Sequence, residues 1–344
     1  MSREKLTASG LAVLVSCMRK FYYRYELNLQ HTSEAAALTF GSAWHRAMEA
    51  RWNGKTVEEV FKAAIAEAKI LDELQIATLT GLLTGYYKCY DHDPIKELQP
   101  EQEFQFPLQG SRTFDVAGKI DGLGIHEDGR PLLLEHKTTS DSVEPDSDYW
   151  LRLRCNNQIM QYVHAARTCG SPVELILYDV TRKPSIKPKT IPTLDEAGLK
   201  IVLLDADGTR VMNKNGKPRE SAGEGMTVQS RAETSEEYGA RLAEDISTRP
   251  EFYFARREVP VLDCDLNEFV IQRLEISRMI LALRRASRST AKPHQAWPRN
   301  CSSMTCQWCD YREPCLQGIE INAANPPAGF IVGVRNPELQ QAAT

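Results

Sequence analysis

The amino-acid sequence predicts an α/β protein, with a strand-rich centre and helical additions at both ends of the chain. Apolar residues recur at helical spacing through most of the first ninety residues and again after residue 235. From residue 101 onward the pattern changes to the two-residue alternation of strands. The order of elements is therefore helices, a strand cluster, and then helix, strand and helices, which favours an α/β core with helices added at either end.

Composition restricts the classes of protein that fit this sequence. Of 344 residues, 42% are hydrophobic and 26% are charged, which is typical of globular proteins with ample material for a core. The formal net charge is −4, with 42 basic against 46 acidic residues. This balance argues against binding of nucleic acid by bulk charge alone, although local basic patches remain possible. The apolar runs are too short to cross a bilayer and no signal peptide is recognisable, so we expect a cytoplasmic protein with no membrane partner.

Residues 1–98 are predicted to form an N-terminal helical region. Helical spacing of apolar residues predicts helices at residues 8–26, 35–52 and 56–90. Thr7 or Ser9 is available as the N-cap of the first helix, and Asn53-Gly54 ends the second. The third ends at the breaker-rich residues 91–94.

Residues 99–194 are predicted to form the core of the fold. Strands are expected at residues 103–106, 113–125, 132–138 and 173–180, and a helix at residues 148–169. The sequence Glu127-Asp128-Gly129-Arg130 signals a hairpin between two of these strands. A polar insertion, a C-terminal region of helices with a cysteine group, and a flexible tail are expected to follow. Their predicted ranges are 195–245, 246–318 and 319–344.

Three charged residues are predicted to converge at the end of an apolar strand pair. Glu135 and Lys137 are two residues apart on one expected strand, so their side chains leave the same face of the sheet. The hairpin brings Asp121 alongside them. Carboxylates beside the apolar residues 132–134 are costly to bury unless they pair or bind a metal, and their oxygens suit Mg²⁺ or Mn²⁺. Such an ion would acidify a water for attack on a phosphodiester, with Lys137 orienting the water.

The same pattern also has a plainer interpretation, because a surface hairpin with a cross-strand ion pair would look alike. However, Asp121, the sequence Glu135-His136-Lys137 and the later Gln158-x3-Tyr162 together resemble the core of PD-(D/E)XK nucleases. The Gln-x3-Tyr motif is that of their RecB-like branch. The proline that precedes the aspartate in the family is Ile120 here, and proline carries no chemistry.

The resemblance implies a restriction-endonuclease-like core, which is a central mixed sheet flanked by helices. It implies that Asp121 and Glu135 bind the metal and that Lys137 positions or activates the water. Gln158 and Tyr162 would line the active site, and the main-chain carbonyl of His136 would be a further metal ligand. From spacing alone, Gln158 and Tyr162 are equally an ordinary amphipathic pair at i, i+4.

A histidine upstream is a further candidate ligand. Gly41 and His45 lie one helical turn apart on an expected helix, where the glycine allows close approach to a neighbour. A lone histidine on an apolar helix face is more often a core or surface residue. The stretch resembles the Gly-x3-His motif of RecB-like nucleases, which implies that His45 completes the metal site. An imidazole ligand makes Mn²⁺ as plausible as Mg²⁺.

The nine cysteines indicate a metal site of a second kind. Cys306, Cys309 and Cys315 are spaced as C-x2-C-x5-C, and Cys301 lies five residues earlier. In a reducing compartment such a group indicates metal ligation, but spacing does not decide between zinc and an iron–sulfur cluster. Local completion of the site by Cys301 would favour Zn²⁺. The alternative fourth ligand is Cys17.

The segment around Cys17 resembles the N-terminal cysteine segment of iron–sulfur nucleases of the AddB and CRISPR-adaptation type. This resemblance implies a [4Fe–4S] cluster on Cys17, Cys306, Cys309 and Cys315, with Cys301 as the rival for one position. The cluster would join the two ends of the chain and stabilise the fold. The remaining cysteines are predicted to be buried small apolar residues, namely Cys89, Cys155, Cys169 and Cys264.

The function expected from these motifs is that of a metal-dependent DNA exonuclease or end-processing nuclease in recombination, repair or phage DNA metabolism. A helicase or recombinase partner fits such a role. Basic residues near the motifs are candidate phosphate contacts, although they are equally solvated surface: Arg152, Arg154, Arg182 and Lys183. Two alternatives remain open, a non-catalytic DNA-end-binding or assembly subunit and a zinc-stabilised nucleic-acid-binding module.

Overall fold

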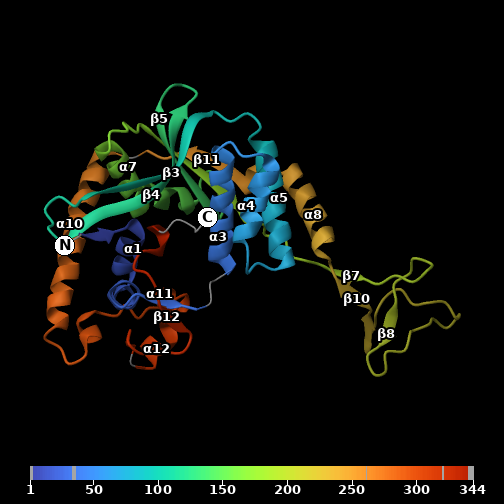
Figure 1. The fold of residues 1–344 in the computed structure, drawn as a ribbon. Coiled ribbons are helices and arrows are strands. Elements are labelled where there is room, and N and C mark those ends of the chain that lie inside the picture. The colour runs from blue at the N-terminus through green and yellow to red at the C-terminus, as the bar shows by residue number, and fades with distance from the viewer. Residues whose placement is uncertain (1–2, 33–35, 261, 320, 340–344) are drawn as a thin grey trace.

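The chain folds into a body built around one six-stranded sheet, and a slender arm projects from this body (Figure 1). The structure is a computed structural model and describes residues 3–32, 36–260, 262–319 and 321–339. Helices lie on both faces of the sheet, and a cysteine-containing region lies beneath them in the view of Figure 1. No helix within these described ranges is both long and apolar enough to span a membrane.

The central sheet is mixed. Its strands are β1 (Glu4–Leu6), β3 (Ile95–Pro107), β4 (Phe114–His126), β5 (Pro131–Thr139), β6 (Leu175–Arg182) and β11 (Phe254–Glu258). The β1–β4 and β5–β6 pairs are parallel, and the β3–β4, β4–β5 and β6–β11 pairs are antiparallel. The prediction of an α/β fold with a central mixed sheet flanked by helices is confirmed.

One edge of β4 is shared by two strands, and this arrangement creates the site described below. β1 pairs with Phe114, Asp115 and Val116 of β4, and β5 pairs with residues 122–125, while β3 occupies the opposite edge. Residues 117–121 lie between the two ladders. Gln161 enters this interval from a helix, and its Nε2 donates to the carbonyl oxygen of Ala117 at 3.1 Å. The interval ends at Asp121.

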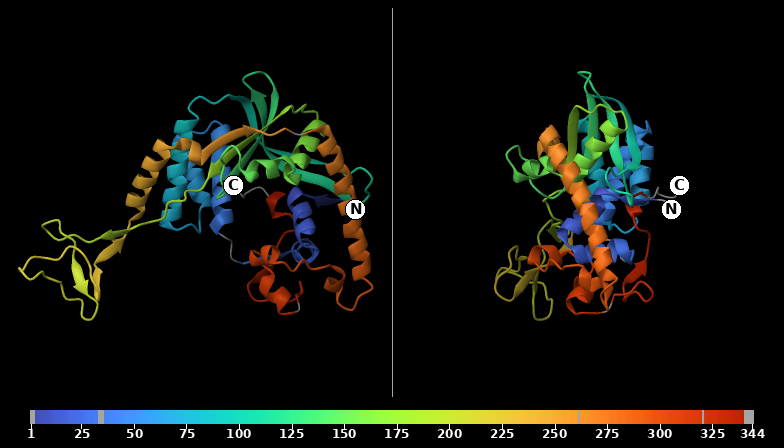
Figure 2. Two further views of the ribbon diagram at one scale, coloured as in Figure 1. Left: turned by 180° about the vertical axis from the view of Figure 1, so that it is seen from behind. Right: turned by 90° about the vertical axis from the view of Figure 1, so that its left-hand side faces the viewer.

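Helices cover both faces of the sheet (Figure 2), and two hydrophobic cores lie beneath them. The first is formed with α1 (Ala8–Ser16), α6 (Asp148–Arg154), α7 (Asn157–Thr168) and α10 (Asp263–Ser287). The second involves α3 (Ala36–Trp52), α4 (Val57–Glu67), α5 (Glu73–Cys89), α8 (Ser235–Thr248) and α9 (Pro250–Tyr253). Residues of β5 alternate between the faces, since Leu133 joins the first core whereas Leu132 and Leu134 pack with Trp52 of α3.

Three predicted helices are interrupted in the structure. The segment 8–26 divides at Cys17, whose extended backbone separates α1 from α2 (Met18–Phe21) and the π-helix η1 (Tyr22–Glu26). The segment 56–90 divides into α4 and α5, because Asp72 starts a new helix through a capping box with Gln75. The segment 148–169 divides where Asn156 caps α7 by accepting a hydrogen bond from the Gln158 amide. Thr7 caps α1, and residue 35 of the predicted second helix lies outside the described residues.

The two ends of the chain pack together below the sheet. This region contains η2 (Pro293–Ala296), α11 (Ser303–Gln307), α12 (Arg312–Leu316) and the antiparallel pair of β2 (Leu29–His31) with β12 (Phe330–Val332). Tyr23, Tyr311 and Phe330 share its small core. The sequence predicts a flexible tail for residues 319–344, whereas β12 and η3 (Pro337–Leu339) are ordered elements within it. Phe330 anchors β12 by stacking on the Tyr311 ring, 5.3 Å away between centroids.

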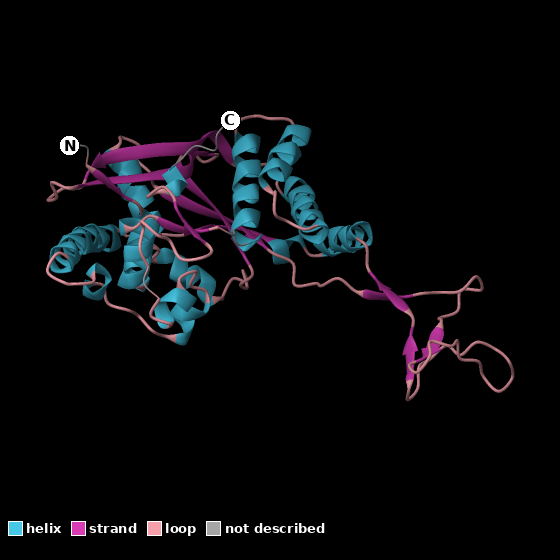
Figure 3. Cartoon of the chain, turned by 60° about the horizontal axis from the view of Figure 1, so that its bottom comes forward, coloured by secondary structure: helices cyan, strands magenta, loops and turns pink. Residues whose placement is uncertain are grey.

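The arm is formed by the polar insertion (Figure 3). Its strands are β7 (Thr190–Pro192), β8 (Val202–Leu204), β9 (Met226–Val228) and β10 (Ser230–Ala232). β7 pairs with β10 and β8 pairs with β9, both antiparallel. The predicted insertion, 195–245, thus differs from the arm at both ends. The paired strands begin before residue 195, and α8 belongs to the body because Leu242 and Ile246 are buried in the second core.

Candidate active site

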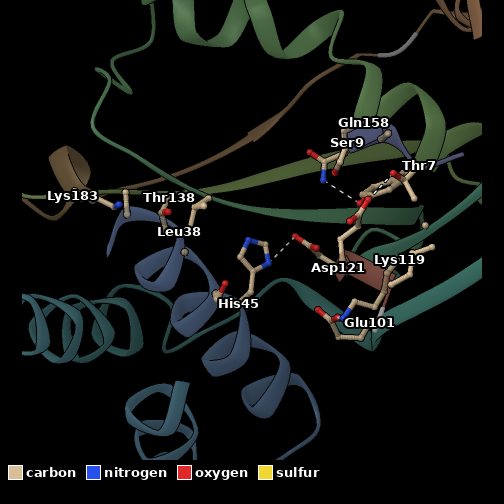
Figure 4. A pocket seen from close by; sticks show the side chains of 18 residues that line it. Thr7, Ser9, Leu38, His45, Glu101, Lys119, Asp121, Thr138, Gln158 and Lys183 are labelled. Atoms are coloured by element: carbon tan, nitrogen blue, oxygen red, sulfur yellow. Dashed lines mark hydrogen bonds and ion pairs between the residues drawn. The ribbon is translucent and has the colours of Figure 1, made fainter. Parts of the chain in front are cut away.

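A cavity of about 620 Å³ opens where the β4–β5 pair meets α1, α3 and α7 (Figure 4). The sheet contributes Asp121 to its wall, and α3 contributes His45. From α7 come Gln158 and Tyr162, both of which also line the cavity. Elements distant in the sequence therefore bring most of the predicted site residues to one place.

Lys137 is the centre of a hydrogen-bonded chain that reaches the cavity through Gln158 and Tyr162. Its Nζ donates to Glu135 Oε1 and, at 2.7 Å, to Gln158 Oε1. The Nε2 of Gln158 in turn donates to the hydroxyl oxygen of Tyr162 at 3.0 Å. Glu135 and Lys137 share a face of β5 that looks toward α7, while Asn156 at the start of α7 sets the first turn that carries Gln158. The ammonium group is thus held between a strand carboxylate and a helix amide.

Asp121 is fixed by the strand that carries Glu135. The last residue pair in the β4–β5 ladder is Gly122–Leu134, and the two strands are not paired beyond it. There the main-chain N–H of His136 donates to Asp121 Oδ2 at 2.8 Å instead of to a backbone carbonyl. A carboxylate thereby replaces the missing rung of the ladder, which holds Asp121 beside the Glu135 strand.

His45 approaches Asp121 from the other side of the cavity. Its Nδ1 lies 3.5 Å from Asp121 Oδ2, and the dashed line in Figure 4 marks this pair. Gly41, one turn earlier on α3, lines the same cavity. A Cβ atom at Gly41 would lie 3.7 Å from Thr138 Oγ1, an ordinary contact, so the close approach of α3 to β5 does not by itself demand glycine.

Glu101 is a site residue that the sequence interpretation missed. One ligand atom each of Glu101, Asp121 and His45 lies within 4.8 Å of the other two, the only such group of three or more among the described His, Cys, Asp and Glu residues. Glu101 lies on β3 between the register pairs Pro100–Gly122 and Gln102–Ile120. It also forms an ion pair with Lys119, which lines the cavity. Beyond its being acidic, no signal in the sequence indicated Glu101, because its position opposite Asp121 depends on the strand pairing.

Burial shifts the pKa values of the ionisable groups at this site. Burial, reinforced by the nearby Asp121 carboxylate, raises the pKa of Glu135 to about 7. Burial also raises the pKa of Asp121 above its ordinary value, despite the neighbouring His136 and Lys137. Burial, with help from His136 and Lys137, lowers the pKa of His45 to about 3, so its ring is neutral and free to act as a ligand. Although burial opposes it, the two carboxylates raise the pKa of Lys137, which stays an ammonium.

The donor set fits a divalent cation. The carboxylates of Asp121 and Glu101 and the neutral imidazole of His45 are ligands that Mg²⁺ or Mn²⁺ accepts, and Glu135 lies outside this group of three. Glu135 is fully buried, yet its Oε2 has no hydrogen-bond partner within the part of the chain that the structure describes. A buried carboxylate oxygen is costly to leave without a partner, and a cation would satisfy it.

The side chain of His136 does not face this cavity with Glu135 and Lys137. Its Nδ1 lies 3.0 Å from Asp179 Oδ2, and Asp179 also accepts a hydrogen bond from the hydroxyl group of Tyr86. The Nε of Arg256 lies 3.2 Å from Asp179 Oδ1. Burial alone would raise the pKa of Asp179, but Arg256 and His136 hold it below its ordinary value. The back of β5 therefore carries an ionised, buried carboxylate.

The C-terminal residues form one side of the cavity. Glu338, in η3, lines it, and the Thr7 hydroxyl donates to Glu338 Oε1 at 2.6 Å. Arg335 anchors this segment, since its Nη1 lies 2.9 Å from Glu4 Oε2. A carboxylate from the C-terminal segment is thus part of the cavity wall. Nothing in the local sequence indicated this placement.

Of the four predicted phosphate contacts, only Lys183 lines the cavity, and its Nζ also lies 4.7 Å from the centroid of the Phe40 ring. Arg152 and Arg154 form surface ion pairs with Asp141 and Asp265. The guanidinium of Arg182 stacks over the Phe252 ring, 4.0 Å from its centroid. The structure therefore separates these three arginines from the cavity.

Five cysteines line a second cavity, at the junction of the two chain ends. They are Cys17, Cys301, Cys306, Cys309 and Cys315. Arg19, Lys20, Arg299 and Arg312 surround them. Cys301 is exposed, and the other four are partly buried. No three of these sulfur atoms lie within 4.8 Å of one another, all five residues being in the described ranges.

The other four cysteines are exposed, so the prediction that they are buried is wrong. They are Cys89, Cys155, Cys169 and Cys264. Each lies at or beside a helix end. Their position away from the second cavity sets them apart from the candidate ligands.

Comparisons with known proteins give two weakly similar solved structures and one family. The solved structure described as SSO0001 is 10% identical, with a TM-score of 0.36 over 93% of this chain and 89% of that one. A structure from Eubacterium rectale, described as a candidate exonuclease, is 11% identical, with a TM-score of 0.33 over 76% of this chain and 87% of that one. The search of curated proteins gives no match. The family model of the PD-(D/E)XK nuclease superfamily matches residues 5–316, and the chain therefore belongs to this superfamily.

Proposed function

We propose that this chain is a divalent-metal-dependent DNA exonuclease or end-processing nuclease of the RecB-like branch. The observation that carries the proposal is the grouping of His45, Glu101 and Asp121 on one cavity, beside the hydrogen-bonded pair of Glu135 and Lys137. Three carboxylates with raised pKa values and one neutral imidazole lie close together here, and the basic side chains that line the cavity, among the described residues, are those of Lys119 and Lys183. Such a cluster is costly to fold unless it binds a metal ion.

Each residue has a role that its geometry supports. His45, Asp121, Glu135 and Glu101 would hold the ion, which acidifies a coordinated water and stabilises negative charge on a phosphodiester. Lys137 keeps its proton because of the two carboxylates, so it orients the attacking water as a hydrogen-bond donor. Gln158 fixes the position of the Lys137 ammonium. Lys183, at the rim, is available to a phosphate group of DNA.

The cysteine cavity is proposed to hold a [4Fe–4S] cluster on Cys17, Cys306, Cys309 and Cys315. A tetrahedral zinc site with Zn–S bonds of about 2.3 Å places its sulfur atoms roughly 3.8 Å apart. The sulfur atoms here are spread more widely than that, since no three fall within 4.8 Å of one another in the described chain. The surrounding arginine and lysine side chains would offset the negative charge of a thiolate-bound cluster. Zinc is therefore the weaker interpretation.

A nuclease assay tests the catalytic proposal directly. The cluster-loaded full chain is incubated with Mg²⁺ or Mn²⁺ and labelled linear single-stranded, linear duplex, end-blocked and circular DNA. We expect metal-dependent degradation of linear DNA with free ends and little cutting of circles. Cutting of circles as fast as linear DNA would contradict the exonuclease assignment while leaving the nuclease assignment in place.

Two lysine variants separate catalysis from general effects of charge. Lys137→Ala should abolish cutting, whereas Lys62→Ala should not, because Lys62 is exposed on α4, where it pairs with Glu58. Undiminished cutting by Lys137→Ala would rule out the mechanism. DNA-end binding without cutting by the wild-type protein in either metal would instead identify the non-catalytic alternative.

A further inference from the structure

The middle residue of the Glu135-His136-Lys137 sequence has a side chain on the back of the catalytic strand. His136 is only 2% exposed, and its Nδ1 lies 3.0 Å from Asp179 Oδ2. The two residues are register partners on the parallel strands β5 and β6. Because successive residues of a strand face opposite sides, this contact lies directly behind the pair Glu135 and Lys137.

Asp179 is itself held firmly. Tyr86, from α5, donates its hydroxyl hydrogen to Asp179, and the guanidinium of Arg256, from β11, contacts the same carboxylate. Arg256 also donates to both oxygens of Asp93, at 2.7 and 3.0 Å. A buried carboxylate with this many partners has one geometry available, so it is a rigid support for the imidazole.

The main chain of His136 connects this support to the metal site. The β4–β5 ladder has ended at Gly122–Leu134, so the β4 backbone no longer restrains β5 at this point. The N–H of His136 instead orients Asp121, at 2.8 Å. A shift of this one residue would move Asp121, Glu135 and Lys137 together, since two are its neighbours and the third is its hydrogen-bond partner.

The other ring nitrogen of His136 is Nε2. Nε2 is buried and has no hydrogen-bond partner among the described residues. The ring of His45 stands perpendicular to it, with 6.2 Å between centroids. The imidazole therefore supports the side of the site that His45 occupies.

We infer that His136 is a positioning residue, whose Asp179-anchored side chain holds Asp121, Glu135 and His45 in the arrangement that binds the divalent ion. The inference rests on the proposed function. It differs from a role for the main-chain carbonyl of His136, because that role would survive any side-chain substitution. Partners outside the metal ligands typically change metal affinity by about 10- to 100-fold when removed.

The test measures Mn²⁺ binding by calorimetry on the full, cluster-loaded chain, alongside the Mn²⁺ dependence of cutting. His136→Leu should weaken Mn²⁺ binding by about 10-fold or more. His136→Asn keeps a donor near the Nδ1 position and should recover most of the affinity. At saturating Mn²⁺ the turnover of His136→Leu should approach that of wild type, since Lys137 and Gln158 remain. Wild-type Mn²⁺ affinity in His136→Leu would overturn the inference.

A matched control is available on the neighbouring strand. His126 of β4 also has its Nδ1 3.0 Å from a carboxylate oxygen, that of Asp128, but it lies at the hairpin away from the cavity. His126→Leu should leave Mn²⁺ affinity unchanged, and an equal loss in this variant would overturn the inference. If His136→Leu does not fold, Tyr86→Phe removes one support of Asp179 and should weaken Mn²⁺ binding several-fold, whereas an unchanged affinity would count against the proposal.

The outcomes distinguish this inference from the proposed function. A wild-type chain that neither binds Mn²⁺ nor cuts DNA would overturn the nuclease proposal itself. A wild-type chain that does both, with His136→Leu indistinguishable from it in Mn²⁺ affinity, would overturn only the role of His136.

Discussion

Glu101 lies across from Asp121 in the β3–β4 pair, and an oxygen of each carboxylate comes within 4.8 Å of the other and of a ring nitrogen of His45. Two carboxylates at this separation repel each other unless a cation lies between them. Burial already raises the pKa of Glu101 above its ordinary value, even though Lys119 is its ion-pair partner. The pair therefore suggests a metal ligand beyond those in the sequence motifs.

Glu101→Gln is predicted to weaken divalent-ion binding and to lower activity at limiting metal by about 10-fold or more. The matched control is Glu103→Gln, because Glu103 lies on the same strand but is exposed and does not line the cavity. Calorimetric titration with Mn²⁺ checks both variants. Equal Mn²⁺ affinities in Glu101→Gln and wild type would mean that Glu101 pairs with Lys119 but does not bind the ion.

The contrast between Glu101 and the motif residues shows what the sequence could predict. Asp121, Glu135 and Lys137 follow from strand periodicity and one hairpin, which are local properties. Glu101 does not, because β3 changes register between Lys96 and Gln99 and Glu101 itself has a φ of 55°. A non-glycine residue with a left-handed backbone cannot be recognised from the alternation of apolar and polar residues. Its position opposite Asp121 emerges only from the strand pairing.

In the rest of the fold, too, the sequence predicted what is local and missed what depends on distant residues. The helices and the long strands were predicted because each has its own periodicity. β11 was missed because its sequence, Phe254-Ala255-Arg256-Arg257-Glu258, is mostly charged, and Arg256 is buried only through its partners Asp179 and Asp93. Burial of a charge depends on residues far away in the chain. Likewise Cys17 ends α1 within an apolar run that has no helix-breaking residue.

Gln158 is predicted to affect turnover, and its near neighbour Gln161 to affect stability. Gln158→Ala removes the acceptor that fixes Lys137, so the turnover rate should fall by about 10-fold or more with little change in metal affinity. Gln161→Leu instead removes the bond to Ala117, lowering the melting temperature while preserving the turnover of the folded fraction. Steady-state kinetics with thermal denaturation separates the two. Similar effects of both substitutions would contradict separate roles for the two glutamines.

The metal-free protein is predicted to lose stability as pH rises through the acidic range because of Glu135. Its folded pKa of about 7 exceeds the ordinary value of 4.5, so the folded state keeps a proton that the unfolded state releases. The contribution to stability is full below pH 4.5 and is lost as pH rises to about 7. His45 has a lowered pKa and acts in the opposite direction, so comparison with Glu135→Gln is needed to isolate Glu135.

Denaturant titrations in the presence of a chelator check this dependence. Relative to Glu135→Gln, the free energy of unfolding of the wild type should fall by about 3 kcal/mol between pH 4.5 and pH 8. Addition of Mn²⁺ at pH 8 should restore stability to the wild type more than to Glu135→Gln. A difference between the two proteins that stays constant with pH would show that Glu135 is not held in a raised-pKa environment.

Cys17 and Cys301 are the two candidates for one position at the proposed cluster, and serine variants decide between them. Cys17→Ser should give protein with lost brown colour, reduced iron content and a lower melting temperature, because Cys17 ties the N-terminal helices to the C-terminal loop. Cys301→Ser should keep all three properties, as should Cys155→Ser, whose exposed thiol lies elsewhere. Bleaching by Cys301→Ser with retained colour in Cys17→Ser would assign the ligand to Cys301. Colourless wild-type protein containing zinc would reject the iron–sulfur proposal.

Glu338 is predicted to oppose DNA binding. Its carboxylate lines the catalytic cavity and accepts a hydrogen bond from Thr7, so an incoming phosphate meets a fixed negative charge there. Two unit charges about 7 Å apart in water repel each other by roughly 0.6 kcal/mol, so Glu338→Gln should tighten single-stranded DNA binding by about 3-fold. The glutamine can still accept a hydrogen bond from Thr7, which preserves the wall of the cavity.

Glu244→Gln, on the exposed side of α8, removes the same charge far from the cavity and should have no such effect. Because exposed charges are screened, the gain should shrink as salt is raised in a fluorescence-anisotropy titration. Weaker binding by Glu338→Gln would show instead that this carboxylate assists the substrate, for example by holding the N-terminus of α1 in place.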